Sequence, residues 1–408
     1  MKVGVHLGFS APEAGGAFTL QYSVSQTLAQ LAQESRHTFV VIGGPKLLMS
    51  PAENIRTVPV FQPTFAKGMF SRLNRTVFRL KNAISYGDDA VTYRYGEVKR
   101  ILKSELDLMW YVGPFCYSMD IPYIYTLLDL QHLLQPYFPE VSADGVWQAR
   151  ERHYAVVLRR ASKIIISTHT GKAEIERFYQ VPSERIVVLP YAAPQFDQSI
   201  LDDSADWVLA KYHLPTNYLF YPAQFWPQKN HIGLLQAVRL LRHKWNISVP
   251  VVFVGSDKGN LNYIQQSVSR LGLSQEVHFL GFVPAQDLIA LYRKAFALVM
   301  PTLVGPDNIP SLEALALSCP VVMSNLPGCY EQLGDAALFL DPKNEEQIAL
   351  TIKSLYNDPE LRQTLVQRGL ERVGRWSWQD YVRGVFKILD DFEPIRRCWS
   401  DTYKLKGP

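Results

Sequence analysis

MPTLVGPDNIPSLEALALSCPVV, residues 300–322, is the segment around which the rest of this chain is organised. It continues an apolar run, residues 296–299, that is typical of a buried parallel strand. Its glycine, prolines and polar residues then predict a turn, and an apolar helix is expected from Pro310, which suits a first helical turn because proline has no N–H to leave unpaired. The stretch is therefore predicted to be a strand, a loop and a helix in immediate succession.

The loop of this stretch has the properties of an anion site. The backbone amides around Asn308, Ile309 and Ser311 are expected to point at a phosphate, with the positive end of the helix behind them. Glu313 would lie one turn into the helix, where a carboxylate can accept two hydroxyls of a ribose. The structural alternative for Glu313 is a charge that only stabilises the helix dipole.

Length and composition predict a two-domain protein. At 408 residues the chain is too long for one compact core, so we expect two domains of about 200 residues each. A Lys+Arg count of 42 against 38 Asp+Glu gives a net charge of +4, which is too weak a bias to indicate a nucleic-acid partner. The four cysteines have no metal-ligand spacing, so no metal site is predicted. Without an apolar run of about 20 residues, a cytoplasmic protein is expected.

The first half opens with a strand over residues 2–7, a loop that contains Gly15 and Gly16, and a helix from about residue 18. Such a unit brings backbone close to a ligand at the carboxyl end of a parallel sheet, although a plain turn is the alternative. Asp129 and His132 follow the predicted strand over residues 122–126. Ligand-binding and catalytic residues of an open parallel sheet lie at this end of its strands. Their alternatives are a helix cap for Asp129 and a packed histidine for His132.

A basic amphipathic segment lies between these two regions. Residues 65–82 contain five cations and no acid, and their apolar residues recur at helical spacing. A helix of this kind is attracted to anionic lipid, so the segment predicts an acceptor or peripheral membrane contact. A surface helix with a solvated cationic face is the alternative.

The second half begins after a linker over residues 190–204, which is rich in proline, small residues and acids. Lys229 precedes a predicted helix, where a cation is electrostatically unfavourable unless an anion lies between it and the helix end. Further on, Gly255 follows one predicted strand, and Phe282 and Val283 follow the next. Phe282 has the simple alternative of an aromatic residue on a loop.

Taken together, these segments resemble the retaining glycosyltransferases of family 4, which have the two-domain GT-B fold. The resemblance covers residues 217–340 strongly and the part before residue 120 weakly. Members of that family carry two glutamates eight positions apart; Glu313 matches the second, but Gly305 stands at the first. They also place an arginine and a lysine five residues apart on the pyrophosphate-binding loop; Lys229 matches the lysine and Gln224 replaces the arginine. The family often has the sequence His-Asp-Leu after a strand of the first domain; in this chain Leu128 stands in place of the histidine, before Asp129.

The resemblance implies an α/β protein of the GT-B fold, with two Rossmann-like domains whose parallel sheets face a cleft. An acceptor-side domain is expected over residues 1–195, a donor domain over 205–375, and a closing helical segment over 376–408. The implied catalytic residues are Asp129, His132 and Lys229. The implied donor-binding residues are Gly15, Gly16, Gln224, Lys229, Gly255, Phe282, Val283, Asp307, Asn308, Ile309, Ser311 and Glu313.

The implied reaction is metal-independent transfer of a hexose or deoxyhexose from a nucleotide-diphosphate sugar, of UDP or GDP type, to a glycan or lipid-linked acceptor, with retention of configuration. No cofactor is expected beyond this co-substrate. Three alternatives stay open: a sugar-nucleotide epimerase or phosphorylase on the same fold, a catalytically inactive partner of another transferase, and an NAD-dependent oxidoreductase. The last lacks the GxGxxG fingerprint.

Overall fold

The computed structural model describes residues 1–8, 15–43, 53–59, 105–116, 118–196, 205–305 and 308–400. By its internal contacts the chain divides into two compact units. The first comprises Met1–Ala11, Leu20–Leu189 and Gln379–Pro408, and the second comprises Pro12–Thr19 and Pro190–Trp378. The predicted basic segment over residues 65–82 and the predicted donor residue Asp307 lie outside the described residues.

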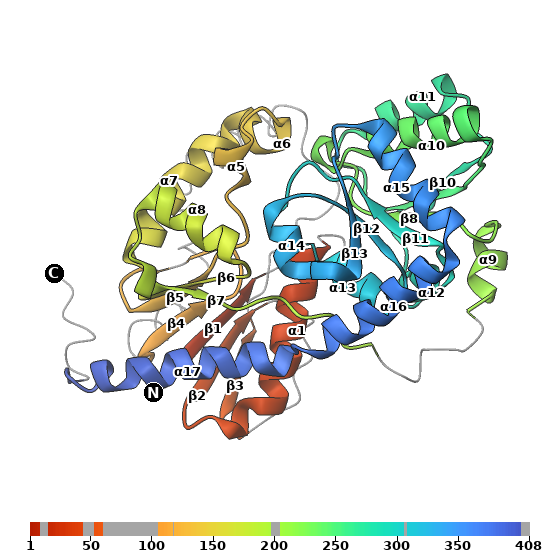
Figure 1. Cartoon of the computed structure of the whole chain (residues 1–408). Coiled ribbons are helices and arrows are strands. Elements are labelled where there is room, and N and C mark those ends of the chain that lie inside the picture. The colour runs from red at the N-terminus through yellow and green to blue at the C-terminus, as the bar shows by residue number, and fades with distance from the viewer. Residues whose placement is uncertain are drawn as a thin grey trace, which may run out of the picture. The chain divides into compact units, whose positions relative to one another are not determined.

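The first unit is built on a parallel sheet (Figure 1). Its strands are β1 (Lys2–Gly8), β2 (Thr38–Gly43), β3 (Ile55–Pro59), β4 (Leu108–Tyr111), β5 (Tyr123–Thr126), β6 (Lys163–Ile166) and β7 (Ile186–Val188). Its helices are α1 (Gly16–Leu31), α5 (Gln131–Leu134), α6 (Pro139–Ser142), α7 (Val146–Arg160), α8 (His169–Tyr179) and α17 (Trp378–Arg396). The strand order is β3-β2-β1-β4-β5-β6-β7.

The core of this unit follows from continuous apolar strands. β4 and β5 are buried along their whole length, as expected for strands that are covered on both faces. The closing helix α17 is fastened to the same unit: Phe386 stacks on Phe39 at 5.6 Å between ring centroids, and Arg396 forms an ion pair of 2.7 Å with Asp107. Helix α17 is therefore part of the first unit's core, although it is the last helix of the described residues.

The second unit repeats this architecture. Its strands are β8 (Leu219–Pro222), β9 (Val251–Val254), β10 (Val277–Phe279), β11 (Ala297–Met300), β12 (Val321–Ser324) and β13 (Ala337–Leu340). Its helices are α9 (Trp207–Tyr212), α10 (His231–Trp245), α11 (Leu261–Arg270), α12 (Ala285–Lys294), α13 (Ile309–Ala316), α14 (Pro327–Leu333), α15 (Glu345–Asn357) and α16 (Pro359–Gly374). The parallel strand order is β10-β9-β8-β11-β12-β13.

This order places β8 beside β11, which are the first and fourth strands of the second sheet. The chain winds to one side from β8 to β10 and to the other side from β11 to β13, so the sheet has a topological switch point between β8 and β11. In open parallel sheets, ligands bind outside the carboxyl ends of the strands at such a point. A ligand site is therefore expected at the loops that follow β8 and β11.

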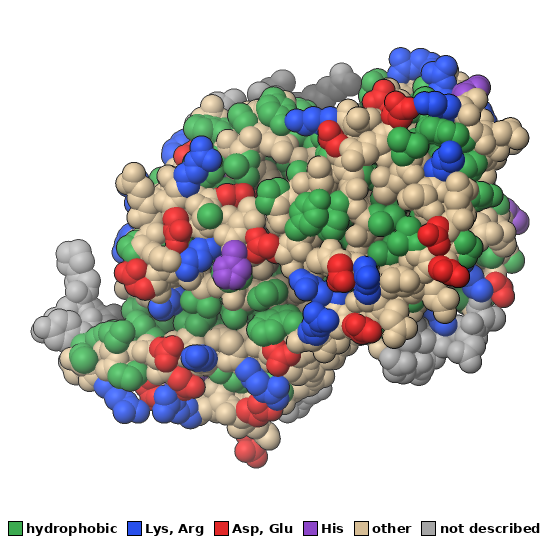
Figure 2. All heavy atoms as spheres, viewed as in Figure 1, with side chains coloured by type: hydrophobic (Ala, Val, Ile, Leu, Met, Phe, Trp, Pro, Cys, Tyr) green, Lys and Arg blue, Asp and Glu red, His purple; other side chains and the backbone are tan. Residues whose placement is uncertain are grey.

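The predicted α/β class, with two parallel Rossmann-like sheets, is confirmed. Residues 300–322 include the end of β11 and the whole of α13, and Pro310 lies in the first turn of that helix. Sequence reasoning did not predict β3, α5, α6, α9 or α12 as elements. On the face drawn in Figure 2, basic and acidic side chains of the described residues are interspersed, in keeping with the small net charge. Within the described residues, none of the helices combines the length and apolar content that a bilayer crossing requires.

Candidate functional site

The two loops at the switch point of the second sheet are joined by hydrogen bonds. The backbone N–H of Leu303 donates to the carbonyl oxygen of Gln228 at 2.9 Å, and the Thr302 hydroxyl donates to the same oxygen at 3.3 Å. Gln228 lies between β8 and α10, whereas Thr302 and Leu303 lie between β11 and α13. The loop that carries Lys229 is thus held against the loop that leads to Asn308.

Asn230 fastens this arrangement. Its backbone has a φ of +54°, which asparagine tolerates better than most residues, and its side-chain oxygen accepts a hydrogen bond from the N–H of Gly233 at the start of α10. Its amide nitrogen donates to Pro301 at 3.0 Å and to Pro342 at 2.7 Å. One side chain therefore caps a helix and ties together the segments after β8, β11 and β13, a role that sequence reasoning missed.

Lys229 lies at the end of the 3-10 turn Pro227–Lys229, directly before the cap residue of α10. Its carbonyl oxygen accepts a hydrogen bond of 2.7 Å from the buried Tyr221 hydroxyl, which fixes the backbone that carries the ammonium group. The side-chain oxygen of Gln224 accepts a hydrogen bond of 2.8 Å from the indole N–H of Trp226. Gln224 thus occupies the predicted loop, and a neighbouring aromatic residue orients it.

The backbone N–H groups at the start of α13 are not equally available to a ligand anion. The N–H of Asn308 donates to the side-chain oxygen of Gln332 at 2.9 Å, and that of Ser311 donates to the carbonyl of Asn308 at 3.2 Å. The Ser311 hydroxyl also donates to the Asn308 carbonyl, at 2.6 Å. The predicted set of three amides is therefore reduced to Ile309, whose N–H has no hydrogen-bond acceptor among the described residues.

Glu313 is partly buried on α13. One of its carboxylate oxygens accepts a hydrogen bond of 2.8 Å from the hydroxyl of Tyr292 on α12. Burial raises the pKa of the Glu313 carboxyl to about 6, and the Tyr292 hydrogen bond opposes that rise. At neutral pH the group is mostly ionised, and its second oxygen has no hydrogen bond within the described residues. Such a carboxylate can accept hydroxyl groups from a ligand.

Gly255 is required by a close backbone approach. Its φ is +154°, and a Cβ there would lie 2.2 Å from the carbonyl oxygen of Ala223. Its N–H donates to the carbonyl of Gly281 at 2.8 Å, so the segments after β8, β9 and β10 pack together at this edge. The next two predicted residues differ: the Phe282 side chain is 51% exposed, whereas Val283 is buried. Only Phe282 presents its side chain to solvent.

Gly305 occupies the position where the resembled family has its first glutamate. Its φ of +112° is a backbone conformation that favours glycine. Its carbonyl oxygen accepts a hydrogen bond from the Asn308 side chain at 3.4 Å. Gly305 thus lacks the glutamate side chain of the family, and its backbone has a conformation that a glutamate would adopt only with strain.

Asp129 and His132, the catalytic residues predicted in the first unit, have protein partners. One Asp129 oxygen accepts hydrogen bonds from the Gln131 N–H at 3.0 Å and from Arg150 at 3.1 Å. The His132 side chain is fully enclosed, and its Nε2 lies 2.8 Å from Glu151. Burial lowers the pKa of His132, and the Glu151 hydrogen bond raises it again in part. The environment of His132 favours the alternative of a packed histidine.

The predicted glycine pair lies where α1 begins. Gly15 has a φ of +67°, and its carbonyl oxygen accepts hydrogen bonds from the N–H groups of Phe18 and Thr19 in the first turn of the helix. Gly16 is the first residue of α1. The pair therefore provides the turn into the helix, which is the simple alternative, and its contact with a donor stays a prediction.

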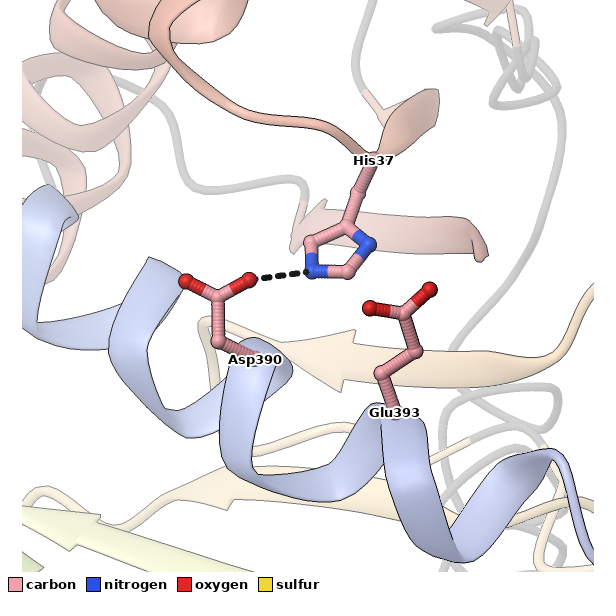
Figure 3. A group of neighbouring side chains, drawn as sticks. All are labelled: His37, Asp390 and Glu393. Atoms are coloured by element: carbon pink, nitrogen blue, oxygen red, sulfur yellow. Dashed lines mark ion pairs between the residues drawn. The ribbon is translucent and has the colours of Figure 1, made fainter.

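Among the described residues, one group has the composition of a metal site. His37, Asp390 and Glu393 bring their potential ligand atoms within 4.8 Å of one another, and Figure 3 shows both carboxylates directed toward the imidazole from α17. Arg36, however, forms ion pairs with Asp390 at 2.8 Å and with Glu393 at 2.9 Å. A guanidinium group thus already neutralises these carboxylates, and the cluster joins α17 to the residues that precede β2.

The comparison with protein families matches part of the second unit. Residues 211–372 match the family model "Glycosyl transferases group 1". The chain is 31% identical over 229 residues to O-antigen chain mannosyltransferase B of Escherichia coli, and 28% identical over 203 residues to O-antigen chain mannosyltransferase RfbU of Salmonella typhimurium. These alignments cover 55% and 50% of this chain and 59% and 53% of the two relatives. The chain thus spans little more than half the length of each.

Solved structures match almost the whole chain. A sucrose-phosphate synthase from Thermosynechococcus elongatus has a TM-score of 0.69 and 16% identity, with 97% of this chain and 99% of that chain covered. The glycosyltransferase WaaG has a TM-score of 0.66 and 17% identity, with 95% and 99% covered. The fold is therefore GT-B. The fold therefore defines the class as GT-B proteins, and residues 211–372 are similar to the glycosyl transferases group 1 model.

Proposed function

We propose that this protein is a retaining glycosyltransferase of family 4 that acts in polysaccharide biosynthesis. It transfers a hexose or deoxyhexose from a nucleotide-diphosphate sugar to a glycan or lipid-linked acceptor without a catalytic metal. The observation that carries the proposal is the switch point of the second sheet, where hydrogen bonds from Leu303 and Thr302 to Gln228 hold the Lys229 loop against the loop that leads into α13. The family match over residues 211–372 supports the same assignment.

Each site residue has a role in this proposal. The Lys229 ammonium neutralises the diphosphate, both in the bound donor and as charge develops on the leaving group. The Ile309 N–H and the positive end of α13 add to this stabilisation. Glu313 accepts the ribose hydroxyls, which fixes the nucleoside half of the donor. Because Gly305 has no side chain, the sugar ring is oriented by other groups, and Asp129 is the proposed one in the first unit.

Mannose is the sugar to test first, because two relatives are named O-antigen mannosyltransferases. The crystal structure of HepE from Anabaena in complex with UDP and glucose matches this chain with a TM-score of 0.66 at 15% identity, so UDP- and GDP-sugars should be compared side by side. Thermal shift of the purified protein against nucleotide sugars identifies the donor, because a ligand at 100 times its Kd adds about 2.7 kcal/mol to the free energy of unfolding.

The reaction itself is tested with the identified donor and a lipid-linked glycan acceptor, and the anomeric configuration of the product is read by NMR. Product with the configuration of the donor is expected. Donor binding without transfer would favour the inactive-partner alternative, and conversion without acceptor would favour an epimerase. Absence of binding to every nucleotide sugar would overturn the assignment.

A further inference from the structure

A pocket of about 300 Å³ lies at the other end of the second sheet. Its lining includes Thr216, Asn217, Ser248, Phe296, Tyr356 and Arg362. Thr216 and Asn217 precede β8, Ser248 precedes β9, and Phe296 directly precedes β11. The pocket is thus formed at the amino ends of the same three strands whose carboxyl ends carry the proposed donor site. A strand of four residues spans about 13 Å, so the two sites are separated by about the length of these strands.

Arg362 distinguishes this pocket from an ordinary surface depression. Its guanidinium carbon lies 5.1 Å from the centroid of the Phe296 ring, and the residue is only partly exposed. Among the described residues its side chain has neither an ion-pair partner nor a hydrogen-bond acceptor. A guanidinium group offers five N–H donors in a planar fork that fits a carboxylate or a phosphate. The stacked position leaves these donors to solvent or to a ligand.

Three other arginines of the second unit have partners. Arg242 forms an ion pair of 2.6 Å with Glu276, and Arg368, on the same helix as Arg362, lies 3.5 Å from Asp335. Arg372 donates to the carbonyl oxygen of Gln332 at 3.1 Å. The alternative for Arg362 is simple packing on Phe296, which would leave its charge without a specific counterion. The remaining lining of the pocket argues against that alternative.

The pocket supplies polar donors and an apolar wall but no carboxylate. The hydroxyls of Thr216 and Ser248 and the amide of Asn217 make no hydrogen bonds with other described residues. Tyr356 is 48% exposed, and its ring centroid lies 6.0 Å from that of Phe296. The lining therefore combines one cation, three polar groups and two aromatic rings.

We propose that this pocket binds a small organic oxyanion. Its phosphate or carboxylate group pairs with Arg362 and accepts hydrogen bonds from Ser248 and Thr216, and its carbon body lies against Phe296 and Tyr356. This assignment does not depend on the proposed transferase activity, because it uses residues on the opposite edge of the sheet from Lys229 and Glu313.

The test uses three probes that separate the two parts of the ligand: phenyl phosphate, phenylacetate and the uncharged benzyl alcohol. Ligand-observed NMR titration of the full-length protein gives each dissociation constant. One or both anions are expected to bind at millimolar concentration or tighter and benzyl alcohol at least tenfold more weakly, because only the anions pair with Arg362. The stronger of the two anions identifies the natural head group as a phosphate or a carboxylate.

Variants place the binding in this pocket. Arg362→Gln should weaken the better anion at least tenfold, and Ser248→Phe, which fills the pocket from its exposed rim, should do the same. Arg368→Gln on the same helix is the matched control and should leave binding unchanged, as should Lys229→Ala at the donor site. Binding that survives both pocket variants, binding lost only in Lys229→Ala, or no binding of either anion would overturn the proposal. A far-ultraviolet CD spectrum of each variant confirms that it folds.

Discussion

The side-chain amide of Asn230 donates a hydrogen bond of 2.7 Å to the carbonyl oxygen of Pro342, which lies 112 residues further along the chain. The same amide donates to Pro301, and the side-chain oxygen caps α10 through the N–H of Gly233. Asn230→Ala removes all three interactions and places alanine at a φ of +54°. We expect it to lower the free energy of unfolding by about 2–4 kcal/mol, from the ordinary costs of a lost cap and lost hydrogen bonds. Urea unfolding measures the change.

Asn246 provides the control for that experiment, because it ends the same helix with the same φ of +54°. Its side chain makes no hydrogen bond to another described residue. Asn246→Ala therefore reports the cost of the backbone conformation alone, about 1 kcal/mol. Equal destabilisation by the two variants would show that the Asn230 side chain does not hold the loops together.

Lys229→Ala should weaken binding of a nucleotide-diphosphate sugar by about 1.5–3 kcal/mol, the range for a hydrogen bond to a charged group. The reason is that Gln224 contributes no charge, so neutralisation of the diphosphate rests on Lys229 and the start of α13. Isothermal titration calorimetry measures the affinity. Lys353→Ala, at a lysine that lies over Trp245, is the control for a general change in charge. Unchanged affinity in Lys229→Ala would remove this lysine from the donor site.

The nature of these elements explains how far the sequence could be read. The strands of the second sheet are short apolar runs bounded by glycine, proline and polar residues, so local pattern predicted β11 and the two strands before Gly255 and Phe282, which are β9 and β10. The role of Asn230 was not predictable, because its acceptors at Pro301 and Pro342 come close only after the sheet has formed. The need for glycine at position 255 is of the same kind, since it depends on the Ala223 carbonyl of a neighbouring segment.

Glu313 predicts a pH dependence of donor binding. Its pKa is raised from the ordinary 4.5 to about 6, so the folded state holds the proton more tightly than the unfolded state. The stabilisation that this proton provides is complete below about pH 4.5 and is lost as the pH rises through 6. If the ionised form accepts the ribose hydroxyls, donor affinity should show the opposite trend and fall as the pH drops below about 6.

The measurement is calorimetric titration with an intact nucleotide sugar between pH 5 and 7.5, because its diphosphate has no ionisation in that window. Glu313→Gln should bind more weakly at pH 7.5 and lose the pH dependence. Loss of binding energy should raise KM and leave kcat little changed, as for an interaction that ground state and transition state share. Wild-type affinity in Glu313→Gln would mean that the ribose is held elsewhere.

Gly305→Glu tests whether the absent glutamate can simply be restored. At a φ of +112° a side chain is strained, so we expect a loss of about 1–3 kcal/mol in the free energy of unfolding and no gain in activity. Gly374→Glu is the control, because a Cβ at Gly374 has no neighbour within 4 Å and its φ is not positive. A variant that keeps full stability and turns over faster would show that the loop accommodates the side chain.

Asp129 and His132 show what position alone can predict. Both follow β5 at the carboxyl edge of the first sheet, which is why the sequence indicated working residues there. The partner that separates them is Glu151, on α7, which lies 2.8 Å from His132 Nε2 and also accepts a hydrogen bond from the Tyr179 hydroxyl. The local sequence around residue 132 does not predict that contact.

The two residues are therefore expected to respond differently to substitution. His132→Ala leaves a cavity beside Glu151 and removes its buried partner, and we expect a loss of about 2–4 kcal/mol in the free energy of unfolding. Asp129→Asn keeps the hydrogen bond from Gln131 but weakens the ion pair with Arg150, which is partly exposed and worth less than about 1 kcal/mol. Its stability should stay close to that of the wild type.

If Asp129 stabilises positive charge on the sugar ring, the kcat of Asp129→Asn should fall at least tenfold with nucleotide affinity unchanged. Urea unfolding, calorimetry and turnover, measured on the same preparations, separate these effects. A His132→Ala variant that is stable but has a low kcat would show that the histidine is catalytic. An Asp129→Asn variant with wild-type kcat would show that the aspartate is not catalytic.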